Sequence, residues 1–188
     1  TAQHAFAQIE FVENKGQWTK EIKYKGSFQT GSVFLENNGL TVLLHQPDDL
    51  NRIANYEHGK QPITNNTTLP LRSHAYRVEF LNASSRCSIR AEKKISTYHN
   101  YYIGNDPSHW APQCHLFQTV VYQNIYPNID LRYYSEGDHL KYDFILHPGA
   151  NPKDIQMKFT GADALSLKDN DLLIHTTVGV VTEKKPYA

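Results

Sequence analysis

Apolar and polar residues alternate along several short stretches of the chain. Successive side chains of a β-strand point to opposite faces, so a period of two gathers the apolar residues on one buried face. The alternation runs through residues 22–25, 76–80 and 155–159, and through the first five residues of 140–146. Unbroken runs of β-branched, aromatic or leucine residues suit more deeply buried strands. Such runs occupy residues 33–35, 40–44 and 119–122.

Turn-forming residues separate these strands. Asn37, Asn38 and Gly39 stand between two of them at the spacing of a hairpin, because Asn and Gly accept positive φ angles. Further turn clusters lie at residues 104–107, 126–128, 135–138 and 168–171. Strands that recur every ~8–15 residues without long helical patterns indicate an all-β fold. We expect an antiparallel, β-sandwich-like or barrel-like domain.

At most one short helix is expected, over about residues 48–57. Acidic residues follow Pro47 at its start, and Leu50, Ile53 and Ala54 share one face of a helical turn pattern. The helix leads into a polar stretch, and the sequence predicts a mobile loop over about residues 58–72.

Two domain divisions agree with this pattern. Residues 1–8 form a flexible N-terminus, and residues 9–188 form either one β-rich domain or two β subdomains joined by the loop at 58–72. Ala5, Phe6 and Ala7 match the small-x-small pattern of a signal-peptidase site, which makes Gln8 a candidate mature start. An ordinary frayed terminus is the alternative.

Composition and charge argue against several classes of function. The 188 residues are 39% hydrophobic and contain 19 Lys and Arg against 19 Asp and Glu, so the formal net charge is zero. A nucleic-acid binder or a polybasic membrane binder needs a positive excess, so neither is expected. No run approaches the ~18 apolar residues of a membrane-spanning helix, and direct membrane insertion is not expected either.

The chain has two cysteines, Cys87 and Cys114. Two are too few for a disulfide scaffold. They form either one bridge or two unpaired thiols, and the Cα separation that decides between these outcomes does not follow from the sequence.

The densest group of aromatic residues lies between positions 98 and 110. Exposed rings flanked by Asn and Asp suit a sugar-binding platform, through stacking and hydrogen bonds. The alternative is that these rings pack between sheets and anchor a corner of the fold. The candidate ligand-binding residues are Tyr98, Tyr101, Tyr102 and Trp110.

Candidate catalytic groups are sparse. Glu136, Asp138 and Asp143 are the nearest approach to the paired carboxylates of a glycosidase. Cys114 stands beside His115, but adjacent strand residues point to opposite faces, so a general base for this thiol has to come from elsewhere. No catalytic residue is therefore assigned.

No metal site or cofactor is expected. The ten histidines are scattered, and zinc, phosphate-loop and dinucleotide-binding motifs are missing from the sequence. Pairs of oxygen-bearing side chains at 128 and 130 and at 169 and 171 suit turn capping, with calcium binding as the alternative.

Several longer segments together resemble one family. They are FVENKGQW (11–18), HAYRVEFL (74–81), YYIGNDPSHW (101–110), VYQNIYPNIDLRYY (121–134), LKYDFILHPGA (140–150), GAD (161–163) and EKKPYA (183–188). The chain resembles, over about residues 9–188, the uncharacterised N-terminal domain of large exported Bacteroidota proteins. In that family the domain precedes SBBP-type β-propeller repeats, Ig-like modules and a type IX secretion or gliding-motility sorting domain. The family domain continues with further strands, so truncation at the C-terminal end is expected.

The resemblance implies a location and no activity. It implies an exported parent protein, at the cell surface or secreted, and it brings no catalytic residues. We therefore expect a non-catalytic structural or interaction module that serves adhesion, surface assembly or type IX secretion. Its expected partners are other domains of the same chain, β-propeller or Ig-like, or proteins of the surface and secretion machinery. The alternatives are a carbohydrate-binding module and, less favoured, a hydrolase.

Overall fold

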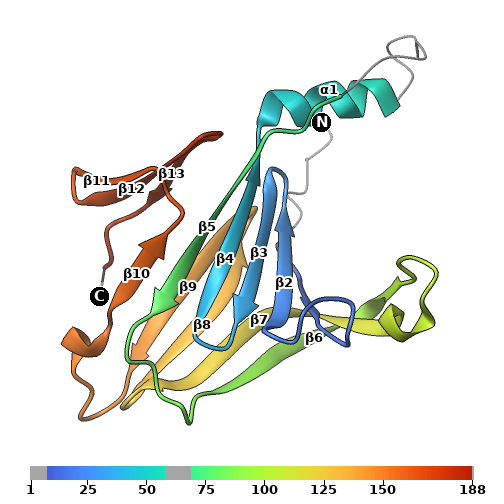
Figure 1. The fold of residues 1–188 in the computed structure, drawn as a ribbon. Coiled ribbons are helices and arrows are strands. Elements are labelled where there is room, and N and C mark those ends of the chain that lie inside the picture. Colours follow the sequence, from blue (N-terminus) through green and yellow to red (C-terminus); the bar gives the residue numbers. More distant parts are fainter. Residues whose placement is uncertain (1–7, 58–68, 188) are drawn as a thin grey trace, which may run out of the picture.

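A computed structural model describes residues 8–57 and 69–187 (Figure 1). The processing site expected at residues 5–7 lies outside the described residues, and so does most of the loop expected at 58–72. The all-β class and the single short helix expected from the sequence are both confirmed for the described part of the chain.

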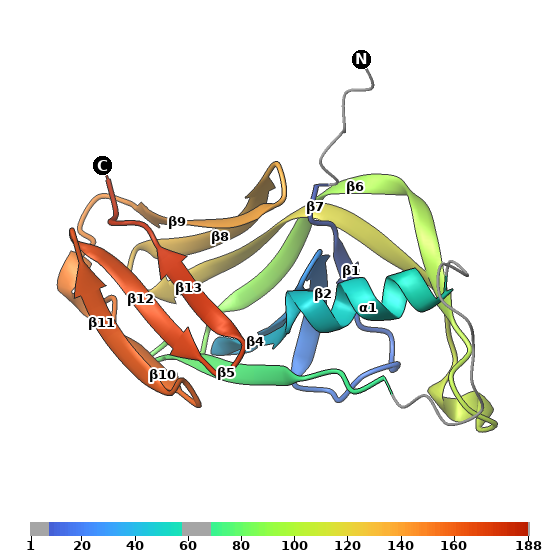
Figure 2. The same cartoon turned by 90° about the horizontal axis from the view of Figure 1, so that it is seen from above.

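The described strands form two antiparallel sheets (Figures 1 and 2). The larger sheet has the order β10-β5-β4-β3-β2-β1-β7-β8-β9, and β6 pairs with β7 off this path. Its strands are β1 (Phe11–Glu13), β2 (Ile22–Phe28), β3 (Gly31–Glu36), β4 (Gly39–His45), β5 (Ser73–Phe80), β6 (Ser88–Tyr101), β7 (Ala111–Tyr126), β8 (Ile129–Glu136), β9 (His139–Leu146) and β10 (Met157–Thr160). The smaller sheet has the order β11-β12-β13, from Ala164–Lys168, Asp171–Thr176 and Gly179–Glu183.

β7 sets the curvature of the larger sheet. Leu116 and Phe117 pair with β1, whereas the stretch from Val120 to Tyr126 pairs with β8. β6 runs along the opposite edge of β7 over both regions. The register shifts at Asn124, which has a φ of 52°, and such bulges bend a strand and increase its twist. The sheet therefore curls into a half-barrel rather than lying flat (Figure 2).

Aromatic side chains form a continuous line through the concave side of the half-barrel. Phe80, Tyr122, Tyr133, Tyr142 and Phe144 follow one another at ring-centroid distances of 5.9–6.2 Å across β5, β7, β8 and β9. Burial of such rings is the largest favourable contribution to a core of this size. The Tyr122 hydroxyl donates to the Glu36 carbonyl at 2.6 Å, so this fully buried polar group is satisfied.

The smaller sheet covers the open side of the half-barrel. Ile174 of β12 is fully buried in the main core. On one side, His74 of β5 contacts the Gly161 carbonyl and accepts from the Thr177 amide. On the other side, the Tyr142 hydroxyl of β9 donates to Glu183 of β13. The smaller sheet thus joins the two halves of the curled sheet (Figure 2).

One glycine of the β3–β4 hairpin is required for a reason other than the one expected. Gly39 does not have a positive φ. A Cβ atom at this position would lie 2.3 Å from the Val78 carbonyl oxygen of β5, so glycine permits the close approach of β4 and β5. The hairpin itself, with Leu35 paired to Leu40, confirms the turn expected at Asn37 and Asn38.

The helix α1 (Pro47–Glu57) is joined to the rest of the domain through a buried carboxylate. Asp49 is fully buried and accepts from the Arg72 amide and guanidinium at 2.9 Å, and from Arg52 at 2.6 Å. The side-chain hydrogen bond from Arg72, followed by its amide, holds the pKa of Asp49 well below its usual range. Within the described residues, no helix has the length and apolar character that crossing a membrane requires.

We expect Asp49→Asn to lower the melting temperature most at neutral pH. The Asp49 pKa is depressed in the folded state, so its stabilisation is complete above the ordinary value of 3.8 and is lost as pH falls below it. In thermal melts, the difference in melting temperature between wild type and variant should be smaller at about pH 3 than at about pH 7. Asp48→Asn, at an exposed neighbouring position, is the control. A gap of equal size at both pH values would contradict the role of the ionised carboxylate.

Candidate functional site

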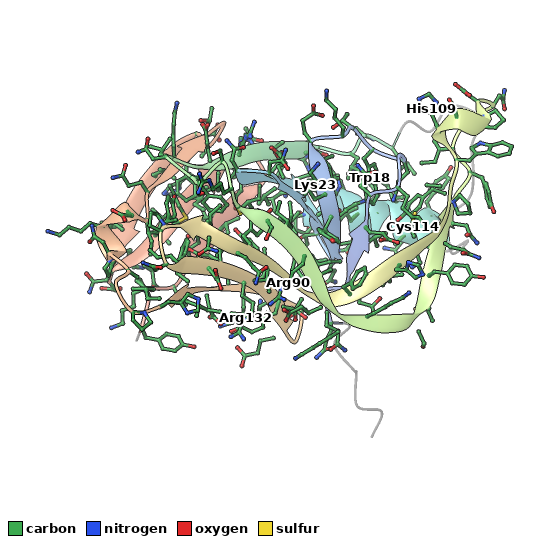
Figure 3. The ribbon with its side chains drawn as sticks, turned by 90° about the horizontal axis from the view of Figure 1, so that it is seen from below. Trp18, Lys23, Arg90, His109, Cys114 and Arg132 are labelled. Atoms are coloured by element: carbon green, nitrogen blue, oxygen red, sulfur yellow. The ribbon has the colours of Figure 1, made fainter. Side chains whose placement is uncertain are left out.

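The most distinctive surface feature is a hairpin that extends from the sheet. It consists of the end of β6, the start of β7 and the short 3-10 helix η1 (Pro107–His109) between them. We call residues 95–114 the arm. Figures 1 and 3 show it projecting from the half-barrel, with His109 near its far end and Cys114 and Trp18 closer to the sheet.

Hydrogen bonds fix the tip of the arm. The Asp106 side chain accepts from the Ser108 amide at 2.9 Å and caps η1. This hydrogen bond is the main reason that the Asp106 pKa is lowered. The Trp110 indole N–H donates to the Gly104 carbonyl at 3.3 Å. Gly104 has a φ of 69°, which glycine adopts without strain.

A small separate core supports the base of the arm. Val12, Ala111, Cys114 and Leu116 are buried together, away from the main core. Trp18, Ile95 and Tyr101 pack against this cluster. Trp18 meets Tyr101 edge to face, with ring centroids 5.4 Å apart and an interplanar angle of 70°.

The loop between β1 and β2 holds Trp18 in this position. The Asn14 amide group donates to the carbonyls of Thr19 and Ile22 at 2.8 Å, so one side chain organises the whole turn. The Lys15 ammonium group then donates to the backbone carbonyls of Pro112 and Gln113 in the arm. Two segments that are about a hundred residues apart in sequence thereby brace each other.

The structure divides the four predicted ligand-binding residues into two groups. Tyr101 is half-buried against Trp18 and belongs to the support of the arm. Tyr98, Tyr102 and Trp110 are 51%, 62% and 42% exposed. Ile103, which sequence analysis did not single out, is 56% exposed beside them. Tyr102, Ile103 and Trp110 therefore present large side chains to solvent at the tip, residues 102–110, whereas Tyr98 pairs with His115 nearer the base of the arm.

The exposed rings do not form one flat platform. Tyr102 and Trp110 lie with ring centroids 5.6 Å apart and an interplanar angle of 87°. This edge-to-face pair is favourable in itself and makes an angular corner. A ligand that stacks on one ring at this corner meets the second ring at its side.

The disulfide considered for Cys87 and Cys114 does not form, since both cysteines are free. Ser88 pairs with Gln123, so Cys87 lies beside the far end of β7, nine residues from Cys114. Nine strand residues span roughly 30 Å, far beyond the ~7 Å Cα separation that a bridge permits. The register of β6 on β7 thus excludes the bridge.

Neither thiol is arranged as a nucleophile. Burial raises the pKa of Cys87 to about 11 and also raises that of Cys114. The imidazole of His115 is bonded to Glu13, with Nδ1 2.7 Å from Oε1. Both cysteines therefore stay protonated at neutral pH.

The carboxylates considered for hydrolysis are held in separate ion pairs. Asp143 pairs with Arg132 on β8, and Asp138 contacts His139 in the β8–β9 turn. Glu136 pairs with Lys141. Five residues, roughly 16 Å of strand, separate Asp138 from Asp143 along the chain, so the structure does not bring these two aspartates together.

The oxygen-bearing turn residues act as caps. Asp130 accepts from the Asn124 amide at 2.7 Å and contacts His147, and these interactions outweigh burial, so its pKa is lowered. Asp171 binds Lys184 and the Lys185 amide. Over the described ranges, 8–57 and 69–187, no cluster of three His, Cys, Asp or Glu side chains suits a metal ion.

An open groove of about 700 Å³ lies between the β1–β2 segment and the β5–β6 connection. Three of its polar side chains already have partners within the fold. Glu13 binds His115, Asn14 binds the β1–β2 loop, and the Lys23 ammonium donates to the Lys20 carbonyl. Because these side chains already form hydrogen bonds within the fold, we take the tip of the arm as the candidate site.

No pattern in the sequence identifies the residues that hold the arm in place. Trp18 and Lys15 lie far from the aromatic group in sequence, and no local signal connects them to it. For Tyr101 and Tyr102 the sequence does contain a signal. Adjacent residues of an extended chain point to opposite faces, so one of these two rings is expected to point outward and the other inward.

We expect the two tryptophans to respond differently to truncation. Trp18→Ala should destabilise the domain by about 2–3 kcal/mol, because it removes a half-buried ring and its edge-to-face contact. Trp110→Ala should cost less than about 1 kcal/mol, because its ring is substantially exposed. Urea unfolding gives both values, and hydrogen exchange should show faster exchange in the arm for Trp18→Ala. Equal losses would contradict the division into support and contact residues.

Comparison with known proteins gives one match. The family described as a domain of unknown function, DUF7948, matches residues 11–188. No curated protein and no solved structure matches the chain. Because the match spans nearly all of the sequence, the chain belongs to the DUF7948 family.

Proposed function

We propose that this domain is a non-catalytic interaction module of an exported multidomain protein, and that the tip of the arm is its contact element. The observation that carries the proposal is the exposure of Tyr98, Tyr102, Ile103 and Trp110 on a hairpin that is itself held in place. Exposed apolar groups cost solvation free energy, and their concentration at one place is typical of interaction sites. The structural support implies that the position of this tip matters.

The support of the arm favours recognition without rearrangement. Trp18 and Lys15 fix its base, and Asp106 and Trp110 fix its tip. A contact surface that is ordered before binding loses less conformational entropy when it binds. The proposed partner of the tip is a component of the cell surface. Other domains of the same chain and proteins of the secretion machinery are proposed as neighbours of the domain as a whole.

Export of the parent protein rests on the sequence segments described above. The proposal places the domain at the cell surface or in the medium, where the arm is accessible to partners. The small-x-small sequence at Ala5, Phe6 and Ala7 supplies the candidate cleavage site.

The location is tested on the full-length protein from its own cells. We expect N-terminal sequencing to give a mature start at Gln8, and protease added to intact cells to degrade the protein. A mature protein that retains upstream residues and resists protease until lysis would contradict export. A cytoplasmic protein of the same preparation serves as the control for intact cells.

The contact role is tested by placing a photo-crosslinking amino acid at Tyr102 in the full-length protein. Illumination of intact cells should give a covalent adduct of higher mass, because the side chain is 62% exposed at the proposed contact. The same group at Leu167, which is 76% exposed on β11, is the matched control. Adducts of equal yield at both positions, or at neither, would count against the arm as the contact element.

A further inference from the structure

The arm carries aromatic rings and two histidines, His99 and His109, but no permanently charged cation. Residues 95–114 contain no Lys or Arg, and their one carboxylate is Asp106. That carboxylate is already bonded to the Ser108 amide and lies 3.3 Å from Nδ1 of His109. Ligands that carry phosphate, sulfate or carboxylate groups are held by cationic side chains. The tip is therefore suited to an uncharged ligand.

The tip is small for a protein partner. A stable protein interface buries ~800 Å² and engages ~20–30 residues on each side. Residues 98–110 alone provide about half that number at most, and their large exposed side chains are the four named above. A narrow ligand that passes along the tip fits this size better than a folded domain does.

The angular corner of Tyr102 and Trp110 suits sugar rings. The face of an aromatic ring carries partial negative charge, which attracts the polarised C–H groups on one face of a pyranose. The planes of the two rings are inclined at 87°, so a sugar stacked on one ring contacts the other ring at its side. The hydrogen bond from the Trp110 indole to Gly104 fixes this ring in advance.

Uncharged polar residues lie on the same hairpin as the rings. Asn105 and Ser108 are exposed at its tip, and Asn100, whose Oδ1 accepts from the Gln113 amide, is exposed on its β6 side. Amides and hydroxyls both donate and accept, which matches the hydroxyl groups of a sugar. Aromatic faces combined with such groups, and without cations, select against anionic and purely apolar ligands alike.

We propose that the tip of the arm binds a neutral polysaccharide. Tyr102 and Trp110 stack on its sugar rings, and Tyr98 extends the contact along the chain of sugars. This inference rests on the proposed function, since it names the partner of the same contact element.

The test is electrophoresis of the full-length protein in native gels that contain a polysaccharide. Dextran, galactomannan and hydroxyethyl cellulose are the neutral probes, and alginate is the charged one. At least one neutral probe should retard the protein, equally at low and high salt, because no ion pair is involved. Tyr102→Ala and Trp110→Ala should each raise the apparent Kd at least ~10-fold. Leu167→Ala should leave it unchanged.

The melting temperature of each variant shows whether a loss of binding comes from the lost contact or from a destabilised fold. Tyr102→Ala removes an exposed ring, so a loss of binding with an unchanged melting temperature assigns the effect to the contact. The absence of retardation by all three neutral probes would overturn the proposal. So would salt-sensitive binding to alginate alone, or binding that survives the double variant. A protein adduct from position 102 together with no neutral-glycan binding would refute the glycan and leave the contact role intact.

Discussion

β7 is sixteen residues long, and one of its edges is shared between β1 and β8. The change of partner on this edge lies between Phe117 and Val120, and a bulge near Asn124, within the part paired with β8, adds further twist. The half-barrel, its aromatic line and the position of the arm all follow from this sharing. β6 stays paired along the opposite edge, and the pair continues past the sheet as the arm.

The domain separates two kinds of aromatic residue. Tyr122 and Tyr133 are fully enclosed in the core, and burial raises both hydroxyl pKa values well above the usual range. Tyr102 and Trp110 stand in solvent, where their rings contribute little to folding. Trp18 and Tyr101 form a third group, packed against the small separate core at the base of the arm. The enclosed rings and the exposed rings thus belong to different parts of the domain.

The sequence predicted β2, β3, β4, β5, β9, β10 and the middle of β7, because burial produces apolar alternation or apolar runs there. It did not predict β1, β8 or the three strands of the smaller sheet, although residues along β8 alternate in burial. It predicted the helix from Pro47 and its apolar face. It did not predict β6, since most of that edge strand is exposed and alternation is weak there. The separation of Cys87 from Cys114 and the pairing of Asp49 with Arg72 depend on long-range register and packing. Local patterns carry no information about either, and the same holds for the contact between Trp18 and Tyr101.

The continuity of β7 has a mechanical consequence. The arm is an extension of β7, which lies in the middle of the sheet, and of its edge partner β6, rather than a loop attached to the surface. Tension applied at the tip passes along β7 into its hydrogen bonds with β1, β6 and β8. These bonds lie across the strand direction, so a pull along the strand loads many of them at once in shear. A ligand held at the tip is thereby tethered to the most deeply anchored strand of the domain.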